Sequence, residues 1–301
     1  MDPLAHSLPA ALAGALRSEL GSSPVSARSL RGGDVADSFA VDLADGRRVF
    51  AKTHSTAPPG FFSTEATGLR WLAEAAAAPT PAVLAVSDGD PSSGVPNHLV
   101  LEWIDEGPGT RPGEESERAF GGALATLHWA GAPCFGREDR RTTGSRALPN
   151  EPCATWAEFY GSQRLVPLAR LARDGRALDD GVVDRLERLA GRLDRLGVPE
   201  EPPARLHGDL WAGNRLLDRR GRSWLVDPAA HGGHREFDLA MMRLFGGFGP
   251  GVFDAYDEAY PLADGWEHRV ALHQIAPLVV HAIKFGGGYR PAATAAIDTY
   301  R

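Results

Sequence analysis

The chain has 301 residues, 43% of them hydrophobic and 24% charged, which is typical of a globular protein with a large core. Its formal net charge of −7 disfavours a nucleic acid or an anionic membrane as partner. Its two cysteines, Cys134 and Cys153, form no Cys-x-x-Cys pair, so we expect neither a zinc site nor a disulfide framework. No apolar run approaches the length of a membrane span and no basic leader opens the chain, so a cytoplasmic protein is expected.

The first hundred residues predict a helix followed by a small sheet. Leu12, Leu16 and Leu20 have helical spacing within residues 9–20, and Gly21 ends that helix. Three strands follow, at residues 25–30, 38–43 and 47–52. A turn at Gly32-Gly33-Asp34 joins the first two, and Asp45-Gly46 predicts a hairpin between the others. A glycine turn between two such strands can lie over nucleotide phosphates, since its backbone N–H groups supply hydrogen-bond donors.

A lysine and a glutamate near this sheet predict a phosphate-binding pair. Lys52 ends the third strand, where its ammonium can reach the α- and β-phosphates of a nucleotide. Glu65 lies in the first turns of a helix predicted over residues 61–77, from which it can pair with Lys52. Taken singly, a solvated lysine and a helix-start acid are the simpler interpretations.

A proline-rich break and a linker divide the chain. Pro79 and Pro81 end the helix, and strands are expected at residues 82–86 and 98–104. The Gly- and Pro-rich segment 105–113 is the best boundary between an N-terminal lobe, residues 1–104, and a C-terminal lobe, residues 114–301. In a two-lobed kinase, the strand entering such a linker offers backbone groups to adenine. The corresponding residues here are Glu102, Trp103 and Ile104.

The rest of the chain is predicted to be mostly helical. We expect helices at residues 114–130, 156–173, 179–196, 236–245, 250–260, 265–285 and 291–300. His128, near the end of the first of these, is expected to pack or cap the helix and not to take part in catalysis.

The stretch from His207 to Asp227 contains the chemistry. Asp209, Asn214 and Asp227 follow one another at spacings of five and thirteen residues. Phosphoryl transfer needs one carboxylate near the acceptor hydroxyl, and an amide with a second carboxylate to hold Mg²⁺. A His-x-Asp followed at this distance by Asn is the catalytic-loop spacing of protein kinases. Residues 215–226 predict a hairpin that returns Asp227 to the side of Asn214.

With these motifs, the chain resembles the fructosamine kinase (ketosamine-3-kinase) family, which is related to aminoglycoside phosphotransferases and protein kinases. The resemblance covers residues 32–289. It rests on His207-Gly208-Asp209-Leu210-Trp211-Ala212-Gly213-Asn214, on Asp227-Pro228-Ala229 and on Arg235-Glu236-Phe237-Asp238-Leu239-Ala240. It implies an α+β, two-lobed protein-kinase-like fold with a small antiparallel sheet and a larger helical lobe.

The resemblance implies a role for each matching residue. Asp209 would be the catalytic base, Asn214 and Asp227 would bind Mg²⁺, and Lys52, held by Glu65, would bind ATP phosphates beneath Gly32 and Gly33. The predicted acceptor contacts are His207, Trp211, Glu236 and Asp238. A packed core position remains an alternative for Trp211, and helix capping for Glu236 and Asp238.

The implied activity is transfer of the γ-phosphoryl group of ATP to O3 of a ketoamine sugar adduct, free or protein-bound, by a monomer or weak dimer. A 3-phosphate destabilises such an adduct and frees the amine, so the reaction would serve deglycation. One alternative is an aminoglycoside- or choline-type phosphotransferase, whose cationic acceptor would need acids such as Asp254, Asp257, Glu258 and Asp264. The other is a catalytically silent pseudokinase that acts as a binding module.

Overall fold

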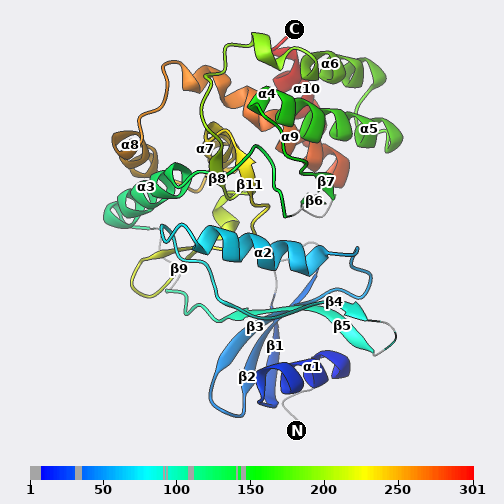
Figure 1. Ribbon diagram of the computed structural model, residues 1–301, viewed down its shortest axis with the longest axis vertical. Helices are drawn as coiled ribbons and strands as arrows, with labels where there is room; N and C mark the ends of the chain where they lie inside the picture. Colours follow the sequence, from blue (N-terminus) through cyan, green and yellow to red (C-terminus); the bar gives the residue numbers. More distant parts are fainter. Residues whose placement is uncertain are drawn as a thin grey trace.

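The protein has two lobes, a small one built on a sheet and a larger helical one (Figure 1). The computed structural model describes residues 8–30, 36–90, 92, 94–107, 112–139, 142–143 and 147–301. The glycine turn at Gly32 and Gly33 lies outside the described residues. None of the helices in the described part of the chain is long and apolar enough to cross a membrane.

The small lobe contains a five-stranded antiparallel sheet in the order β1-β2-β3-β5-β4. Its strands are β1 (Pro24–Leu30), β2 (Asp37–Leu43), β3 (Arg48–Thr53), β4 (Val83–Asp90) and β5 (Val95–Glu102). Strand β4 continues into the segment expected to be a loop, because Asp88 and Asp90 still pair with β5. Strand β5 ends at Glu102, two residues earlier than expected, where the chain enters the linker.

Two helices cover opposite faces of this sheet. Because side chains of a strand alternate between faces, Val100 points toward α1 (Ala10–Leu20), whereas Leu99 and Leu101 point toward α2 (Phe61–Ala73). Helix α1 ends at Gly21, whose φ of 68° is the left-handed conformation that closes many helices. Helix α2 lies between the sheet and the large lobe (Figure 1) and ends four residues earlier than predicted.

The large lobe is built from helices around two hydrophobic clusters. One cluster joins α3 (Glu114–Trp129), α7 (Glu236–Phe245) and α8 (Pro250–Ala259). The other joins α5 (Val166–Asp174), α6 (Asp180–Ala190), α9 (Trp266–Phe285) and α10 (Tyr289–Asp298). The second cluster also receives α4 (Trp156–Phe159), and the 3-10 turn η2 (Leu193–Arg195) follows α6.

The predicted helix at residues 156–173 is interrupted by a π-helical segment, η1 (Tyr160–Leu165). One residue of this segment is bonded to a neighbouring helix. Pro277, inside α9, has no N–H with which to bond the carbonyl of His273, one turn earlier. The Tyr160 hydroxyl instead contacts the carbonyls of Leu272 and His273, at 2.8 and 3.2 Å. The π segment thus places a tyrosine where α9 lacks its own donor.

Short strands flank the segment from His207 to Asp227. Strand β8 (Ala204–Leu206) pairs with β11 (His231–Gly233), and β9 (Arg215–Leu217) pairs with β10 (Ser223–Leu225). A 3-10 turn, η3 (Ala212–Asn214), precedes β9. A further two-stranded sheet, β6 (Thr142–Thr143) with β7 (Leu148–Pro149), lies in the segment between α3 and α4.

Candidate active site

Lys52 joins the two lobes through ion pairs with two carboxylates. Its ammonium lies 2.9 Å from Oε1 of Glu65 on α2 and also contacts Oδ1 of Asp227 from the large lobe. Burial alone would lower the pKa of Lys52, but the charges of Glu65 and Asp227 outweigh that effect and raise it. Burial, reinforced by Asp227, raises the pKa of Glu65, and the Lys52 charge opposes this rise. Lys52 therefore stays charged, with two acids sharing one ammonium.

Gly68 allows α2 to approach the Asp227 segment. A Cβ atom at this position would lie 3.3 Å from Cγ of Pro228 and 3.4 Å from Cβ of Ala230. Both distances are at the lower limit of ordinary van der Waals contact, so a larger side chain would push the helix away. Because Glu65 lies one turn before Gly68, this close packing keeps the Glu65 carboxylate within reach of Lys52.

The hairpin β9–β10 returns the chain to Asn214, as predicted. Asp218 closes its turn by accepting hydrogen bonds from the N–H groups of Arg220 and Arg222, each at 2.9 Å. Past the hairpin, the Val226 N–H donates to the Asn214 carbonyl at 3.1 Å. Asp227 then adopts a φ of 52°, which is uncommon for a residue other than glycine. This conformation turns the Asp227 carboxylate toward Lys52.

Asp209 and Asn214 face each other across the catalytic loop. The Asn214 side-chain amide donates to the Asp209 carbonyl at 2.8 Å and to its Oδ2 at 3.2 Å. The same amide lies 3.5 Å from the Asp227 carbonyl. Burial, together with the Asp227 charge, raises the pKa of Asp209 to about 7, although the Asn214 hydrogen bond opposes the rise. A carboxylate with such a pKa can accept a proton near neutral pH.

Asp238 anchors the start of this loop through hydrogen bonds to its backbone. Its fully buried carboxylate accepts hydrogen bonds from the backbone N–H groups of His207 at 2.7 Å and Gly208 at 2.9 Å. His128 completes the arrangement, because its ring lies 3.3 Å from Asp238 and 2.7 Å from the Tyr256 hydroxyl. His128 is therefore a packed helix residue, as expected. Asp238 positions the catalytic loop and is not an open acceptor contact, contrary to that prediction.

His207 is also buried and does not reach an acceptor. One of its ring nitrogens lies 2.9 Å from the Val226 carbonyl, and the other accepts the Asp209 N–H at 3.2 Å. The ring thus ties the start of the loop to the strand that leads to Asp227. Burial lowers the pKa of His207, so it remains neutral in this role.

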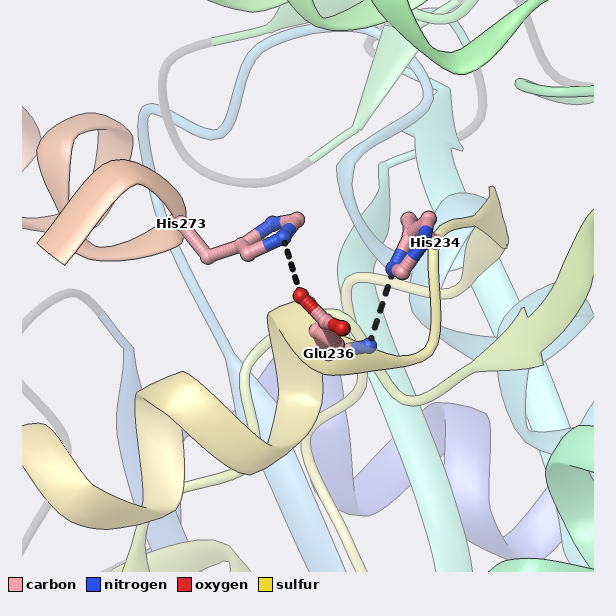
Figure 2. A group of neighbouring side chains, drawn as sticks. All are labelled: His234, Glu236 and His273. Carbon is pink, nitrogen blue, oxygen red and sulfur yellow. Dashed lines mark hydrogen bonds and ion pairs between the residues drawn. The ribbon is translucent and has the colours of Figure 1, made fainter. Parts of the chain in front are cut away.

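Glu236 belongs to a buried network at the start of α7, shown in Figure 2. Its carboxylate points toward His273, 3.3 Å away, and its backbone N–H toward His234. The three residues offer possible metal ligands within 4.8 Å of one another. However, Arg269 already donates to both oxygens of Glu236, at 2.9 and 2.5 Å. The guanidinium neutralises the carboxylate and would repel a divalent cation. We therefore assign a structural role to Glu236, whereas the sequence predicted that it contacts the acceptor.

Trp211 is placed differently from the other three predicted acceptor contacts. It is 42% exposed and packs edge-on against Phe245, with ring centroids 6.3 Å apart. A Cβ atom at Gly213 would lie 2.2 Å from the Trp211 ring, so the glycine makes room for it. The ring is therefore not in the core and leaves surface open beside Asp209.

The strand that enters the linker has backbone groups without partners. The Glu102 N–H donates to the Ala82 carbonyl at 2.9 Å, and so it is occupied. Within the described residues, the backbone N–H groups of Trp103 and Ile104 form no hydrogen bond. The linker is further tied to the large lobe, since the Gly107 N–H donates to the Leu217 carbonyl at 2.9 Å.

Sequence reasoning missed some of the residues that shape this site. The contact of Gly68 with Pro228 has no local pattern, because it joins a helix to a loop about 160 residues later in the chain. The role of Arg269 on Glu236 is similarly non-local. The glycine at position 208 did indicate a turn before Asp209 in the sequence. In the structure, Gly208 has a φ of 80°, a conformation that favours glycine.

Comparisons with known proteins show the family to which the chain is similar. A family model described as fructosamine kinase matches residues 11–301. A probable ketoamine kinase of Enterococcus faecium is 35% identical over 86% of this chain and 89% of its own length. The chloroplastic protein-ribulosamine 3-kinase of Arabidopsis thaliana is 33% identical over 85% of this chain and 77% of its own.

Solved structures give the same result. The crystal structure named "putative fructosamine-3-kinase" from Thermobifida fusca has a TM-score of 0.84 and 40% identity, covering 96% of this chain and 97% of that one. The aminoglycoside phosphotransferase APH(4)-Ia has a TM-score of 0.63 at 15% identity, over 96% of this chain and 99% of its own, which shows a shared fold alone. The protein is thus a kinase with a protein-kinase-like fold, and the chain belongs to the fructosamine kinase family.

Proposed function

We propose that this kinase transfers the γ-phosphoryl group of ATP to a hydroxyl, O3 by analogy, of a ketoamine sugar adduct. The observation that carries the proposal is the convergence of Lys52, Asn214 and Asp227 around Asp209. Relatives named for ketoamine and ribulosamine substrates support the choice of acceptor. Phosphorylation at O3 destabilises the adduct and frees its amine, which would make the reaction a deglycation step.

In this proposal each residue has one task. Lys52, held by Glu65, binds the α- and β-phosphates of ATP. Asp209 accepts the proton of the attacking hydroxyl, or orients it, and its raised pKa of about 7 suits that task. Because the reaction is an in-line displacement, the protein contributes positioning and charge neutralisation and forms no covalent intermediate.

The donor groups of Asn214 and Asp227 fit Mg²⁺. Magnesium prefers oxygen ligands, and the Asn214 amide nitrogen already bonds Asp209, which leaves its Oδ1 for a cation. Asp227 is ionised, because Lys52 lowers its pKa although burial opposes this. When bound, the metal neutralises charge on the transferred phosphoryl group.

The nucleotide-binding lobe of the proposal comprises residues 1–104, with 105–113 as linker and 114–301 as the catalytic and acceptor-binding lobe. Adenine would bind along Glu102, Trp103 and Ile104, where the unpaired N–H groups of Trp103 and Ile104 support recognition. Gly32 and Gly33 would cover the phosphates. A cytoplasmic location, no nucleic-acid partner and a monomer or weak dimer stay predictions.

The two alternatives are not favoured. An aminoglycoside- or choline-type acceptor would need a group of acids, but Glu258 pairs with Arg118 at 2.5 Å and Asp257 caps the Leu262 N–H at 2.7 Å, both on α8. These acids are exposed on α8, whereas the buried residues of that helix pack against α3. A pseudokinase is not favoured, since Lys52, Glu65, Asp209, Asn214 and Asp227 are all present.

The test is a coupled ADP-release assay with fructoselysine, ribuloselysine and kanamycin as acceptors, with and without Mg²⁺. We expect turnover with a ketosamine and none with kanamycin. Asp209→Asn should lower kcat by about a thousandfold or more while ATP still raises the melting temperature. Turnover of kanamycin alone, or near-normal kcat of Asp209→Asn, would contradict the proposal.

A further inference from the structure

A series of aromatic rings runs from the catalytic loop to the end of α9. Trp211 lies 6.3 Å from Phe245, Phe245 lies 4.9 Å from His281, and His281 lies 5.5 Å from Phe285, measured between ring centroids. Tyr289, at the start of α10, supports the far end at 5.0 Å from His281. We refer to Trp211, Phe245, His281 and Phe285 as the aromatic surface.

The two ends of the aromatic surface are open to solvent. Trp211 is 42% exposed and Phe285 is 49% exposed, while Phe245 and His281 between them are partly covered. Exposed single rings are common on proteins, but here the two are joined by packed rings and one lies two residues from Asp209. A bound acceptor could therefore contact both exposed rings while its hydroxyl lies at Asp209.

A lysine stands next to the outer ring. The Lys284 ammonium lies 4.8 Å from the centroid of the Phe285 ring, in the last turn of α9. A cation at a helix end also stabilises the helix, so the position alone does not assign it to a ligand.

The choice of lysine at this position is informative. The chain contains 32 Lys and Arg residues, and lysine occurs only at positions 52 and 284. Arginine is therefore the usual cation of this protein, and it suits planar, bidentate pairing. Lysine is a compact point charge on a flexible stem, so its ammonium can follow a charged group whose position varies. Of the two lysines, one pairs with Glu65 and Asp227, and the other lies beside the aromatic surface.

The positive charge of Lys284 indicates which kind of acceptor would bind beside it. A ketosamine has a sugar end, whose hydroxyl must reach Asp209, and an amine carrier beyond it. A sugar at Trp211 would leave the carrier to extend along the aromatic surface toward Phe285 and Lys284. A cation there favours a carrier with a negative group, and it disfavours a polycationic acceptor such as an aminoglycoside.

We propose that Lys284 and Phe285 form a carrier subsite that selects ketosamines of free amino acids, with Lys284 pairing with the carrier carboxylate. The inference rests on the proposed function and names the substrate class of the same site. Phe285 supplies apolar contact to the carrier chain, and Lys284 distinguishes a free carboxylate from the neutral amide of a peptide. Both residues lie outside the group that holds ATP, so their effect is expected on acceptor affinity.

The test compares fructoselysine with its α-carboxamide as acceptors, with KM and kcat measured for each. The wild-type protein should have a KM for the carboxylate about fivefold lower than for the amide. Lys284→Gln should remove this difference by raising the KM of the carboxylate alone, with the KM of ATP unchanged. Lys284→Arg should keep most of the difference, because it keeps the charge. Phe285→Ala should raise the KM of both acceptors.

The matched control is Arg118→Gln, which removes a charge of the same sign from α3, where Arg118 pairs with Glu258 of α8, and should leave both KM values unchanged. Equal KM values of wild type for the two acceptors would overturn the carrier subsite. So would an equal effect of Lys284→Gln on both acceptors, or an effect on the KM of ATP. Absence of turnover with either ketosamine would instead refute the proposed function.

Discussion

The hydrogen bonds that hold the catalytic loop should be measurable through Asp238. In Asp238→Asn, one carbonyl oxygen still accepts an N–H bond, but the new NH₂ group faces the second backbone donor. One of the two bonds to His207 and Gly208 is lost, and the other loses its charge. Hydrogen bonds to a charged group contribute about 1.5–3 kcal/mol each, so we expect a destabilisation of about 2–3 kcal/mol. At about 2–4 °C per kcal/mol, the melting temperature should fall by about 5–10 °C.

The catalytic effect should exceed the effect on stability. Asp209 follows directly after the two bonded N–H groups, so a loosened loop misplaces its carboxylate relative to the acceptor. We therefore expect kcat to fall by about a hundredfold, with the KM of ATP nearly unchanged because Lys52 and Glu65 keep their contact. The assays are thermal unfolding and ADP release at saturating ketosamine.

The control is Asp254→Asn, which removes the same charge from an exposed position on α8. It should change stability by no more than about 0.5 kcal/mol. If Asp238→Asn matched this control in both melting temperature and kcat, the assignment of Asp238 as support of the loop would be refuted.

Three further predictions concern the charges and the backbone. Lys52→Met leaves Glu65 buried without its partner and should abolish ATP-dependent stabilisation; the double variant Lys52→Met/Glu65→Gln should recover folding in a denaturation assay but not ATP binding. Gly208→Ala should destabilise by about 2–4 kcal/mol, since φ is 80° and the new Cβ would lie 2.2 Å from a backbone oxygen. Gly122→Ala, where nothing lies within 4 Å, should not destabilise, and similar losses in the two variants would argue against the steric reasoning. Burial lowers the pKa of His231 to about 3 in the folded chain, whereas an unfolded histidine has a pKa of about 6.5. Below about pH 6.5 the unfolded chain therefore binds a proton at His231 that the folded chain does not bind, so acid lowers the free energy of unfolding. Between about pH 7.5 and about pH 5.5, wild type should therefore lose about 1.4 kcal/mol more unfolding free energy than His231→Phe, as measured by urea titration; equal losses would contradict the buried neutral imidazole.

Local patterns were sufficient for most of the fold. Apolar spacing and glycine or proline boundaries predicted α1, β2, β3, α3, α7, α8 and α9 to within about two residues at each end. The hairpin after Asn214 and the pairing of Lys52 with Glu65 were also predicted, because each depends on motifs at fixed spacing. The π segment at Tyr160 was not predicted, and the carbonyl that its tyrosine hydroxyl contacts lies on α9, more than a hundred residues later in the chain.

The predicted acceptor contacts could not be placed correctly from sequence patterns. His207, Glu236 and Asp238 were predicted to contact the acceptor because they accompany the catalytic motif in sequence. In the structure each of them is buried and satisfied by a backbone group or a guanidinium. Residue type gave the chemistry of these groups, but whether they face solvent depends on the packing of α7 against α9, which has no local signal. Trp211, with the same kind of motif evidence, remained exposed.

The ion pairing of Lys52 also affects how readily this lysine can itself be glycated. Reducing sugars attack unprotonated primary amines, and this chain has ε-amino groups at two positions only, 52 and 284. Since Glu65 and Asp227 keep the first of these protonated and nearly enclosed, it is a poor nucleophile toward a sugar aldehyde. An enzyme that meets glycated amines would thereby keep its own Lys52 from being glycated.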